Sequence, residues 1–342
     1  MENNKTFSLF STCIPVRGYK RSIIYDLNRY SFYYVPNDLI EVIKALEKKS
    51  LGILEKEYSI KEWKIVGEYI KYLVDLDLGF YLNIDDKNSF PQIDLYWDYP
   101  EVISNIILQY SLLLKKYIKI VLQNIDKLNC SSLEIRIQNT ICYSELVCFL
   151  DIFNNSIIQT IDIILYKDTL SKIQLEKISK NNRLRKIIIL SSTRNYLSGK
   201  IHFIKTGTSS QKKISISKRE FFTVNINFFS ESQEYNTYFN RKLYINAEGN
   251  IYNSPETINT YGNIFDNRTN ILNLVSSTAY QKLWRIPKTK IEPCNICEYR
   301  FMCLDNRIPL LKSKPKGEIM YFFTEECEYN PISMKWSDDY EN

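Results

Sequence analysis

The chain has a single histidine, His202, and only nine glycines among its 342 residues. One imidazole excludes any catalytic mechanism or metal site that needs a pair of histidines. The glycines form neither a G-x-x-x-x-G-K-S/T loop nor a G-x-G-x-x-G loop, so both common phosphate-binding turns are missing. The sequence therefore excludes the nucleotide enzymes that depend on those loops.

Long apolar runs are missing as well. No stretch approaches the roughly 20 apolar residues that cross a bilayer, and residues 1–13 show no apolar core followed by a cleavage site. We therefore expect a cytoplasmic protein with no membrane partner. Hydrophobic residues make up 44% and charged residues 25% of the chain, which excludes a disordered polypeptide. The length is typical of two or three domains.

The net charge of +6 is modest but unevenly distributed. Residues 161–220 hold 14 Lys and Arg against four acidic residues. Such a segment either attracts an acidic partner or forms a solvated face of lysines. Because no RNA- or DNA-binding motif accompanies it, we do not expect nucleic acid as a partner.

Residues 1–84 are predicted to form one small unit. Two β-like runs at 21–27 and 31–35 favour a hairpin, after which Asn37 or Asp38 offers a helix N-cap. Short helices are expected near 39–46 and 51–58. A third helix is marked by Ser59 and Glu62 as a capping pair and by an apolar stripe; the stripe is Trp63, Val66, Ile70 and Leu73. Gly79 ends that helix and 80–82 return as a strand, which predicts a winged-helix-like unit.

Residues 90–230 alternate between strand and helix patterns. The expected strands are 92–97, 132–137, 160–165, 185–190, 200–204 and 222–228, and the expected helices are 102–128, 143–153 and 170–180. This alternation is typical of βαβ units with parallel strands. The fold class is therefore α/β, with a partial (β/α) barrel expected and an open doubly wound sheet as the alternative.

Residues 231–342 are loop-rich and form the predicted third domain. A hairpin is expected where 242–245 and 250–253 flank Glu248 and Gly249. Of the eight cysteines in the chain, Cys130, Cys142 and Cys148 lie in apolar patterns and are expected to be buried, while Cys13 is either structural or free.

Four cysteines in this last segment form a different pattern. Cys294 and Cys297 are a C-x2-C pair, followed by Cys303 and Cys327. A C-x2-C turn points two thiolates at one ion or cluster, and two later cysteines complete a tetrahedron. A metal or iron–sulfur site is therefore predicted; two disulfides or four unligated thiols are the alternatives. Thiolate chemistry alone does not choose between zinc and a 4Fe–4S cluster.

A resemblance to the SPASM domain of radical-SAM peptide maturases is carried by two segments, 243–264 (LYINAEGNIYNSPETINTYGNI) and 282–307 (KLWRIPKTKIEPCNICEYRFMCLDNR). The ending CEYNP with Trp336 and the opening segment 10–39 extend it over nearly the full length. The chain is most similar to the SPASM-domain peptide maturases of grasp-with-spasm systems. This resemblance implies a ribosomally made precursor peptide and an ATP-grasp ligase as partners, and a 4Fe–4S cluster on the cysteine quartet.

The chain departs from that family at two sites. Ser254 and Asn306 stand where a second cluster would have cysteine, and Phe239 lies where the family tends to have another. The C-x3-C-x2-C motif that binds the S-adenosylmethionine-cleaving cluster is absent after 92–97. One auxiliary cluster and no S-adenosylmethionine cleavage are therefore expected.

The N-terminal unit resembles the peptide-recognition domains of ribosomal-peptide biosynthesis, which add a leader peptide as a strand to a sheet edge. The expected groove lies between hairpin 23–35 and helix 63–73, with Tyr25, Tyr33 and Tyr34 lining it. Alternatively, these aromatics only pack the domain. DNA binding is disfavoured because the third helix has as many acids as bases.

The expected function is that of a maturation protein, which binds the precursor leader and presents the core peptide alongside the ligase. No catalytic residue is expected, and whether the chain is an enzyme is left open. The alternatives are an iron–sulfur enzyme that modifies the precursor directly and a zinc-stabilised structural or interaction protein.

Overall fold

The computed structural model describes residues 4–190, 197–204, 222–313 and 319–337. The chain divides into two compact units, each assembled from separate segments. The first unit comprises Met1–Trp97, Ser215–Thr237 and Ile286–Asn342, and the second comprises Asp98–Ile214 and Tyr238–Arg285. The three predicted domains, 1–84, 90–230 and 231–342, are consecutive segments of the chain. The third of them contains both 238–285 and 286–342, which the structure assigns to different units.

The N-terminal part of the first unit contains five strands and three α-helices. They are β1 Lys5–Leu9, β2 Cys13–Arg17, β3 Arg21–Asp26, β4 Ser31–Pro36, α1 Asn37–Leu46, α2 Leu51–Leu54, α3 Ile60–Asp75 and β5 Gly79–Asn83. Strands β2, β3 and β4 form an antiparallel sheet with β4 at one edge, and β1 pairs with β5. The predicted hairpin and returning strand are confirmed.

Helix α3 begins at the predicted capping pair. The Glu62 backbone N–H donates to Ser59 Oγ over 3.3 Å, and the Ser59 N–H donates to Glu62 Oε2 over 2.9 Å. The predicted cap of α1 is wrong, because the residue before that helix is Pro36, which offers no side-chain cap. Asn37 uses its amide elsewhere: it accepts from Ser22 Oγ over 2.6 Å.

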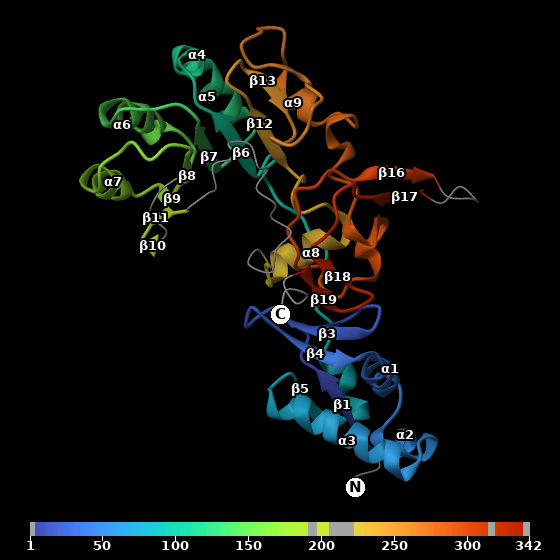
Figure 1. Ribbon diagram of the computed structural model, residues 1–342. Coiled ribbons are helices and arrows are strands. Elements are labelled where there is room, and N and C mark those ends of the chain that lie inside the picture. The colour runs from blue at the N-terminus through green and yellow to red at the C-terminus, as the bar shows by residue number, and fades with distance from the viewer. Residues whose placement is uncertain (1–3, 191–196, 205–221, 314–318, 338–342) are drawn as a thin grey trace. The chain divides into compact units, whose positions relative to one another are not determined.

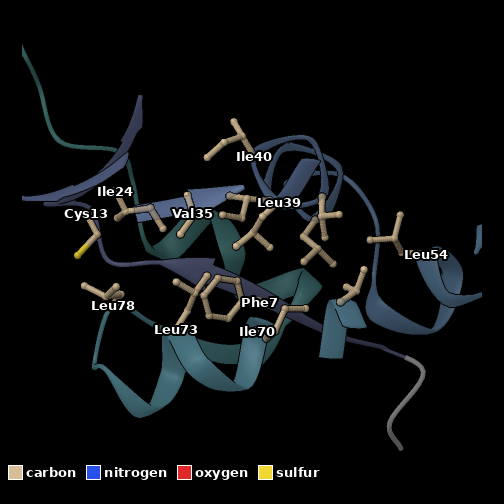
Figure 2. Close-up of a cluster of buried hydrophobic side chains, with 14 residues drawn as sticks. Phe7, Cys13, Ile24, Val35, Leu39, Ile40, Leu54, Ile70, Leu73 and Leu78 are labelled. Carbon is tan, nitrogen blue, oxygen red and sulfur yellow. The ribbon is translucent and has the colours of Figure 1, made fainter. Parts of the chain in front are cut away.

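A hydrophobic core joins this sheet to the helices (Figure 2). Phe7 of β1 lies at its centre, between the sheet and α3. Val66, Ile70 and Leu73 of the predicted stripe are buried in it. Cys13 belongs to the same core, where burial raises the pKa of its thiol to about 12, so Cys13 is a neutral structural residue.

The described residues in the rest of the first unit form one α-helix, short 3₁₀ helices and short strands. The α-helix and the strands are α8 Ile226–Glu234, β15 Ile291–Glu292, β16 Leu310–Ser313, β17 Ile319–Phe322, β18 Tyr329–Asn330 and β19 Lys335–Trp336. The predicted strand 222–228 is wrong, because Asn225 caps α8 by accepting from the Phe228 N–H over 2.8 Å. The predicted strand 92–97 is also wrong, since these residues form neither strand nor helix.

The second unit is built on a nine-stranded sheet with the order β10-β11-β9-β8-β7-β6-β12-β13-β14 (Figure 1). Its strands are β6 Asn105–Gln109, β7 Ser132–Ile137, β8 Thr160–Leu165, β9 Leu184–Ile189, β10 Leu197–Ser198, β11 Ile201–Phe203, β12 Lys242–Ile245, β13 Asn250–Tyr252 and β14 Gly262–Asn263. The pairings from β11 through β12 are parallel. The predicted α/β class with a mostly parallel sheet is confirmed.

Helices connect the parallel strands. They are α4 Leu112–Lys116, α5 Ile118–Lys127, α6 Tyr143–Asp151 and α7 Lys172–Ser179, with α9 Ile271–Val275 after β14. Because β6, β7, β8 and β9 are neighbours in chain order, right-handed crossovers place α5, α6 and α7 on one face of the sheet (Figure 1). The predicted helix 102–128 is wrong in its first part, where the buried strand β6 lies.

The predicted hairpin at Gly249 is confirmed, and it extends this sheet. Strands β12 and β13 are antiparallel, while β12 also pairs in parallel with β6. Gly249 has a φ of +83°, and a Cβ there would lie 2.3 Å from the Phe265 ring, so only glycine suits the turn.

Two of the cysteine predictions in this unit are wrong. Cys130 is buried as expected, but Cys142 and Cys148 are exposed. Cys142 precedes the first residue of α6, and Cys148 lies one turn after the exposed Ser144, on the same outer face of α6. Among the described residues, no helix is long and apolar enough to cross a membrane.

Candidate functional site

All four cysteines of the predicted quartet lie in the first unit. Cys294 begins a 3₁₀ helix, Cys294–Ile296, directly after β15, and Cys297 follows that helix. The Cys303 N–H donates to the Tyr299 carbonyl over 3.0 Å, and Cys327 precedes β18. All four residues are partly exposed and their thiols are free, so the structure contains neither of the two disulfides considered as an alternative.

The thiols lie near enough to affect one another electrostatically. Burial raises the pKa of Cys294 to about 11 and of Cys303 to about 12, and Asp305 adds to both. Cys327 further raises the pKa of both thiols, and burial together with Cys294 raises the pKa of Cys297. Without a cation, Cys294, Cys297 and Cys303 therefore keep their protons, and a bound metal would displace them.

The side chains are not drawn together as they would be around a single ion. Within 4–190, 197–204, 222–313 and 319–337, no three His, Cys, Asp or Glu side chains are arranged to hold a metal ion. Zinc binds thiolate sulfur at about 2.3 Å, so the sulfur atoms would have to come closer together to bind it.

A buried ion cluster lies beside the quartet. Lys288 Nζ lies 3.3 Å and Arg307 Nη2 2.7 Å from Asp305 Oδ2, and these three side chains are at most 9% exposed. Burial raises the pKa of Asp305, but Lys288 and Arg307 lower it by more. The pKa is therefore lowered to about 2, and the carboxylate is charged.

This cluster carries one net positive charge close to the thiols. Lys288 lowers the pKa of both Cys294 and Cys303, and the thiols in turn raise the pKa of Lys288 and Arg307. A four-thiolate centre is anionic, and buried charges need partners of opposite sign. The donor set and its charged surroundings therefore fit such a centre.

The positions of the predicted lost cluster are buried in both units. Phe239 and Ser254 of the second unit are completely buried, and Asn306 of the first unit is 7% exposed. Ser254 Oγ has no hydrogen-bond partner among the described residues. A small polar side chain buried without a partner is uncommon.

The segment 294–327, which contains the four cysteines, is called the cysteine segment below. A second polar cluster, which the sequence does not predict, connects this segment to the sheet of β2, β3 and β4. We call it the Glu298 cluster; its members are Arg21, Tyr34, Glu298, Tyr299 and Tyr329. Glu298 is 1% exposed, and its Oε1 lies 2.8 Å from Arg21 Nε and 2.5 Å from the Tyr329 hydroxyl. An acidic residue directly after the C-x2-C pair is the only signal of it in the sequence.

A groove lies between the edge strand β4 and helix α3. This pocket of about 660 Å³ is lined by Lys20, Arg21, Tyr34, Val35, Pro36, Ile65, Glu68, Tyr69, Tyr72 and Met334. The predicted lining is correct for Tyr34. It is wrong for Tyr25, which is buried and donates its hydroxyl to the Glu298 carbonyl over 2.7 Å, and Tyr33 packs against the hydrophobic core instead.

The basic segment 161–220 lies partly outside the described residues. Within its described part, Lys186 Nζ lies 3.6 Å from Asp162, Arg185 also pairs with Asp162, and Lys172 lies 3.9 Å from Glu176. These lysines and arginines have acidic neighbours within their own unit.

Comparison with known proteins gives little. No family model matches the chain, and no curated protein matches it. Solved structures with some similarity include the crystal structure of Streptococcus suis SuiB, at 11% sequence identity over 89% of this chain and 94% of that chain, with a TM-score of 0.26. A TM-score that low supports no statement about fold or function.

Proposed function

We propose that this chain binds an extended peptide in the groove between β4 and α3, as a maturation protein of a ribosomally made peptide. The observation that carries the proposal is the position of β4. It is the edge of its sheet, and the groove runs between it and α3.

An edge strand presents backbone N–H and C=O groups that a further strand can pair with. A bound peptide would gain affinity from main-chain hydrogen bonds and specificity from pockets for alternate side chains. Strand β4 has six residues, so it offers a pairing length of about 20 Å.

The groove lining indicates the chemistry of the peptide. Ile65 and Tyr72 of α3 are 52% and 44% exposed and suit apolar side chains. Lys20 and Glu68 add one charge of each sign. The occupant we propose is the leader of a precursor peptide, with apolar side chains directed at α3 and an acidic side chain near Lys20.

The arrangement of the N-terminal elements supports a winged-helix-like peptide-recognition domain. A three-stranded antiparallel sheet is followed by three helices, and β5 then pairs with β1. The open sheet with its crossover helices on one face supports a partial (β/α) barrel for the second unit.

The cysteine quartet is proposed to hold one 4Fe–4S cluster, with zinc as the alternative. Cys294, Cys297, Cys303 and Cys327 supply the ligands, and Lys288 and Arg307 offset their charge. Such a cluster supplies either a structural staple or an electron-transfer centre. We propose no S-adenosylmethionine cleavage, and we propose the ATP-grasp ligase as the partner that acts on the presented core peptide.

Peptide binding is tested by selecting ligands from a random 12-residue library on the immobilised full chain. The strongest peptide, labelled with fluorescein, is then titrated against two variants of α3. Ile65→Asp places a charge in the groove and is expected to lower affinity at least about tenfold, which is about 1.4 kcal/mol. Ile60→Asp is the matched control, because Ile60 is 92% exposed and does not line the groove. A library without any enriched peptide, or equal affinity of both variants, would contradict the proposal.

A further inference from the structure

Arg21 belongs both to the lining of the groove and to the Glu298 cluster. It lines the groove beside β4, and its side chain is 26% exposed there. Its Nε also donates to Glu298 over 2.8 Å, and its Nη2 donates to the Tyr299 hydroxyl over 2.8 Å. One wall of the groove is therefore held in place by residues of the cysteine segment.

Tyr34 has the same double position. It lines the groove from β4, and its hydroxyl lies 2.7 Å from that of Tyr299. The Arg21 guanidinium stacks 3.9 Å from the centre of the Tyr34 ring. Tyr299 thus contacts both groove residues.

The residues that make these contacts are close in sequence to two of the predicted cysteine ligands. Glu298 and Tyr299 follow Cys297 directly, and Tyr329 is two residues after Cys327. Figure 1 shows β18, which begins with Tyr329, near β3, which begins with Arg21.

The backbone is tied to the sheet too. Arg300 Nη1 donates to the Cys297 carbonyl over 2.7 Å and to the Arg17 carbonyl of β2 over 2.8 Å. Because Glu298 is 1% exposed, Arg21 and Tyr329 satisfy a carboxylate that water does not reach.

We infer that occupancy of the cysteine quartet controls the affinity of the peptide groove. Drawing four thiols onto one centre fixes the backbone on either side of Cys297 and Cys327, which fixes Glu298, Tyr299 and Tyr329. These hold Arg21 and Tyr34 in the binding position, so the loaded protein meets the peptide with its groove wall pre-organised. This regulation rests on the proposed peptide-binding function.

Linkage makes the effect reciprocal: if metal raises peptide affinity by some factor, peptide raises metal affinity by the same factor. Coupling between sites typically amounts to about 5- to 150-fold. We therefore expect at least about a fivefold difference in peptide dissociation constant between loaded and metal-free protein.

The test uses the full chain purified anaerobically, with its metal content measured, and the same preparation after dialysis against EDTA. The selected 12-residue peptide is titrated against both by fluorescence anisotropy. In addition, the EDTA concentration that removes half of the metal from loaded protein is measured with and without saturating peptide, since this second readout does not require the metal-free chain to stay folded. Peptide is expected to raise that concentration.

Two variants test whether Tyr299 carries the effect of the metal on peptide affinity. Tyr299→Phe removes the hydroxyl that contacts Arg21 and Tyr34 but leaves every cysteine in place, so it should keep its metal and lose the metal dependence of peptide binding. Glu68→Gln is the control: Glu68 lines the groove, and in it the metal dependence should persist whatever the absolute affinity.

The outcomes separate the two proposals. A metal-dependent affinity that disappears in Tyr299→Phe supports the connection. Equal peptide affinity with and without metal, together with an unchanged EDTA midpoint, overturns the connection but not the peptide site. Absence of peptide binding in both forms overturns the peptide site and the connection with it.

Discussion

Arg21 and Glu298 form an ion pair across 277 positions of the chain, with 2.8 Å between Nε and Oε1. The carboxylate is 1% exposed, while the guanidinium side chain is 26% exposed. This pair joins the first antiparallel sheet to the cysteine segment. The pair is thus a long-range contact between β3 and the residue that follows Cys297.

Replacing Glu298 by Gln keeps the shape of the side chain and removes its charge. We expect the free energy of unfolding to fall by about 1–3 kcal/mol, because a buried charged hydrogen bond is lost. Glu41→Gln is the matched control: Glu41 pairs with Arg17 at 2.6 Å, but both side chains are more than half exposed. Its loss should cost less than about 1 kcal/mol in urea denaturation. Equal costs for the two variants would contradict the structural role of Glu298.

Ser254 provides a second stability test. Its hydroxyl is fully buried and has no hydrogen-bond partner among the described residues. Ser254→Ala is therefore expected to leave stability unchanged or to raise it by up to about 1–2 kcal/mol. Ser22→Ala should instead destabilise by about 1 kcal/mol, because Ser22 Oγ is buried and donates to Asn37 over 2.6 Å. Thermal unfolding of the two variants distinguishes them, and a clear loss of stability in Ser254→Ala would show that its hydroxyl is bonded.

Thiol alkylation tests the environment of Cys142. Its side chain is exposed, and contact with Ser144 Oγ at 3.3 Å, together with the Glu145 N–H, lowers the pKa of the thiol. A lowered pKa means that the thiolate forms at lower pH. Iodoacetamide should therefore modify Cys142 already at pH values below those at which an ordinary thiol reacts. Cys130 is buried with its pKa raised to about 12 and should stay unmodified in the folded chain.

Ser144→Ala should move the rate profile of Cys142 to higher pH, as followed by mass spectrometry. An unchanged profile in this variant, or modification of Cys130 at a similar rate, would show that the local contacts do not control these thiols.

Elements with strong local signals are predictable from the sequence. Helix α3 has both its capping pair and its apolar stripe within one stretch, and both are found. Strand β7 alternates between buried and half-buried residues, which is the period of a half-covered strand. In such elements the local pattern and the tertiary burial agree.

Where local patterns are ambiguous, the tertiary environment decides. Strand β6 contains the continuous apolar run Ile106, Ile107 and Leu108, and periodicity cannot separate such a buried parallel strand from a buried helix. The apolar segment near Phe228 reads as a strand until Asn225 is recognised as a helix cap.

The site divides in the same way. The cysteine quartet is a prediction from spacing alone, whereas the Glu298 cluster depends on contacts between distant segments. No short-range sequence pattern connects Arg21 with Glu298. The contact between the groove and the cysteine segment is therefore visible only in the folded chain.

The proposed cysteine centre is tested most directly by purifying the chain anaerobically and measuring iron, inorganic sulfide and zinc, in the parent and in Cys297→Ser. Cys142→Ser is the control, since Cys142 belongs to the second unit, whereas all four cysteines of the quartet belong to the first. We predict about four iron atoms and about four sulfides per chain in the parent and the control, and their loss in Cys297→Ser with a less stable fold. A parent chain free of bound metal, or a Cys297→Ser variant with unchanged metal content, would contradict the centre.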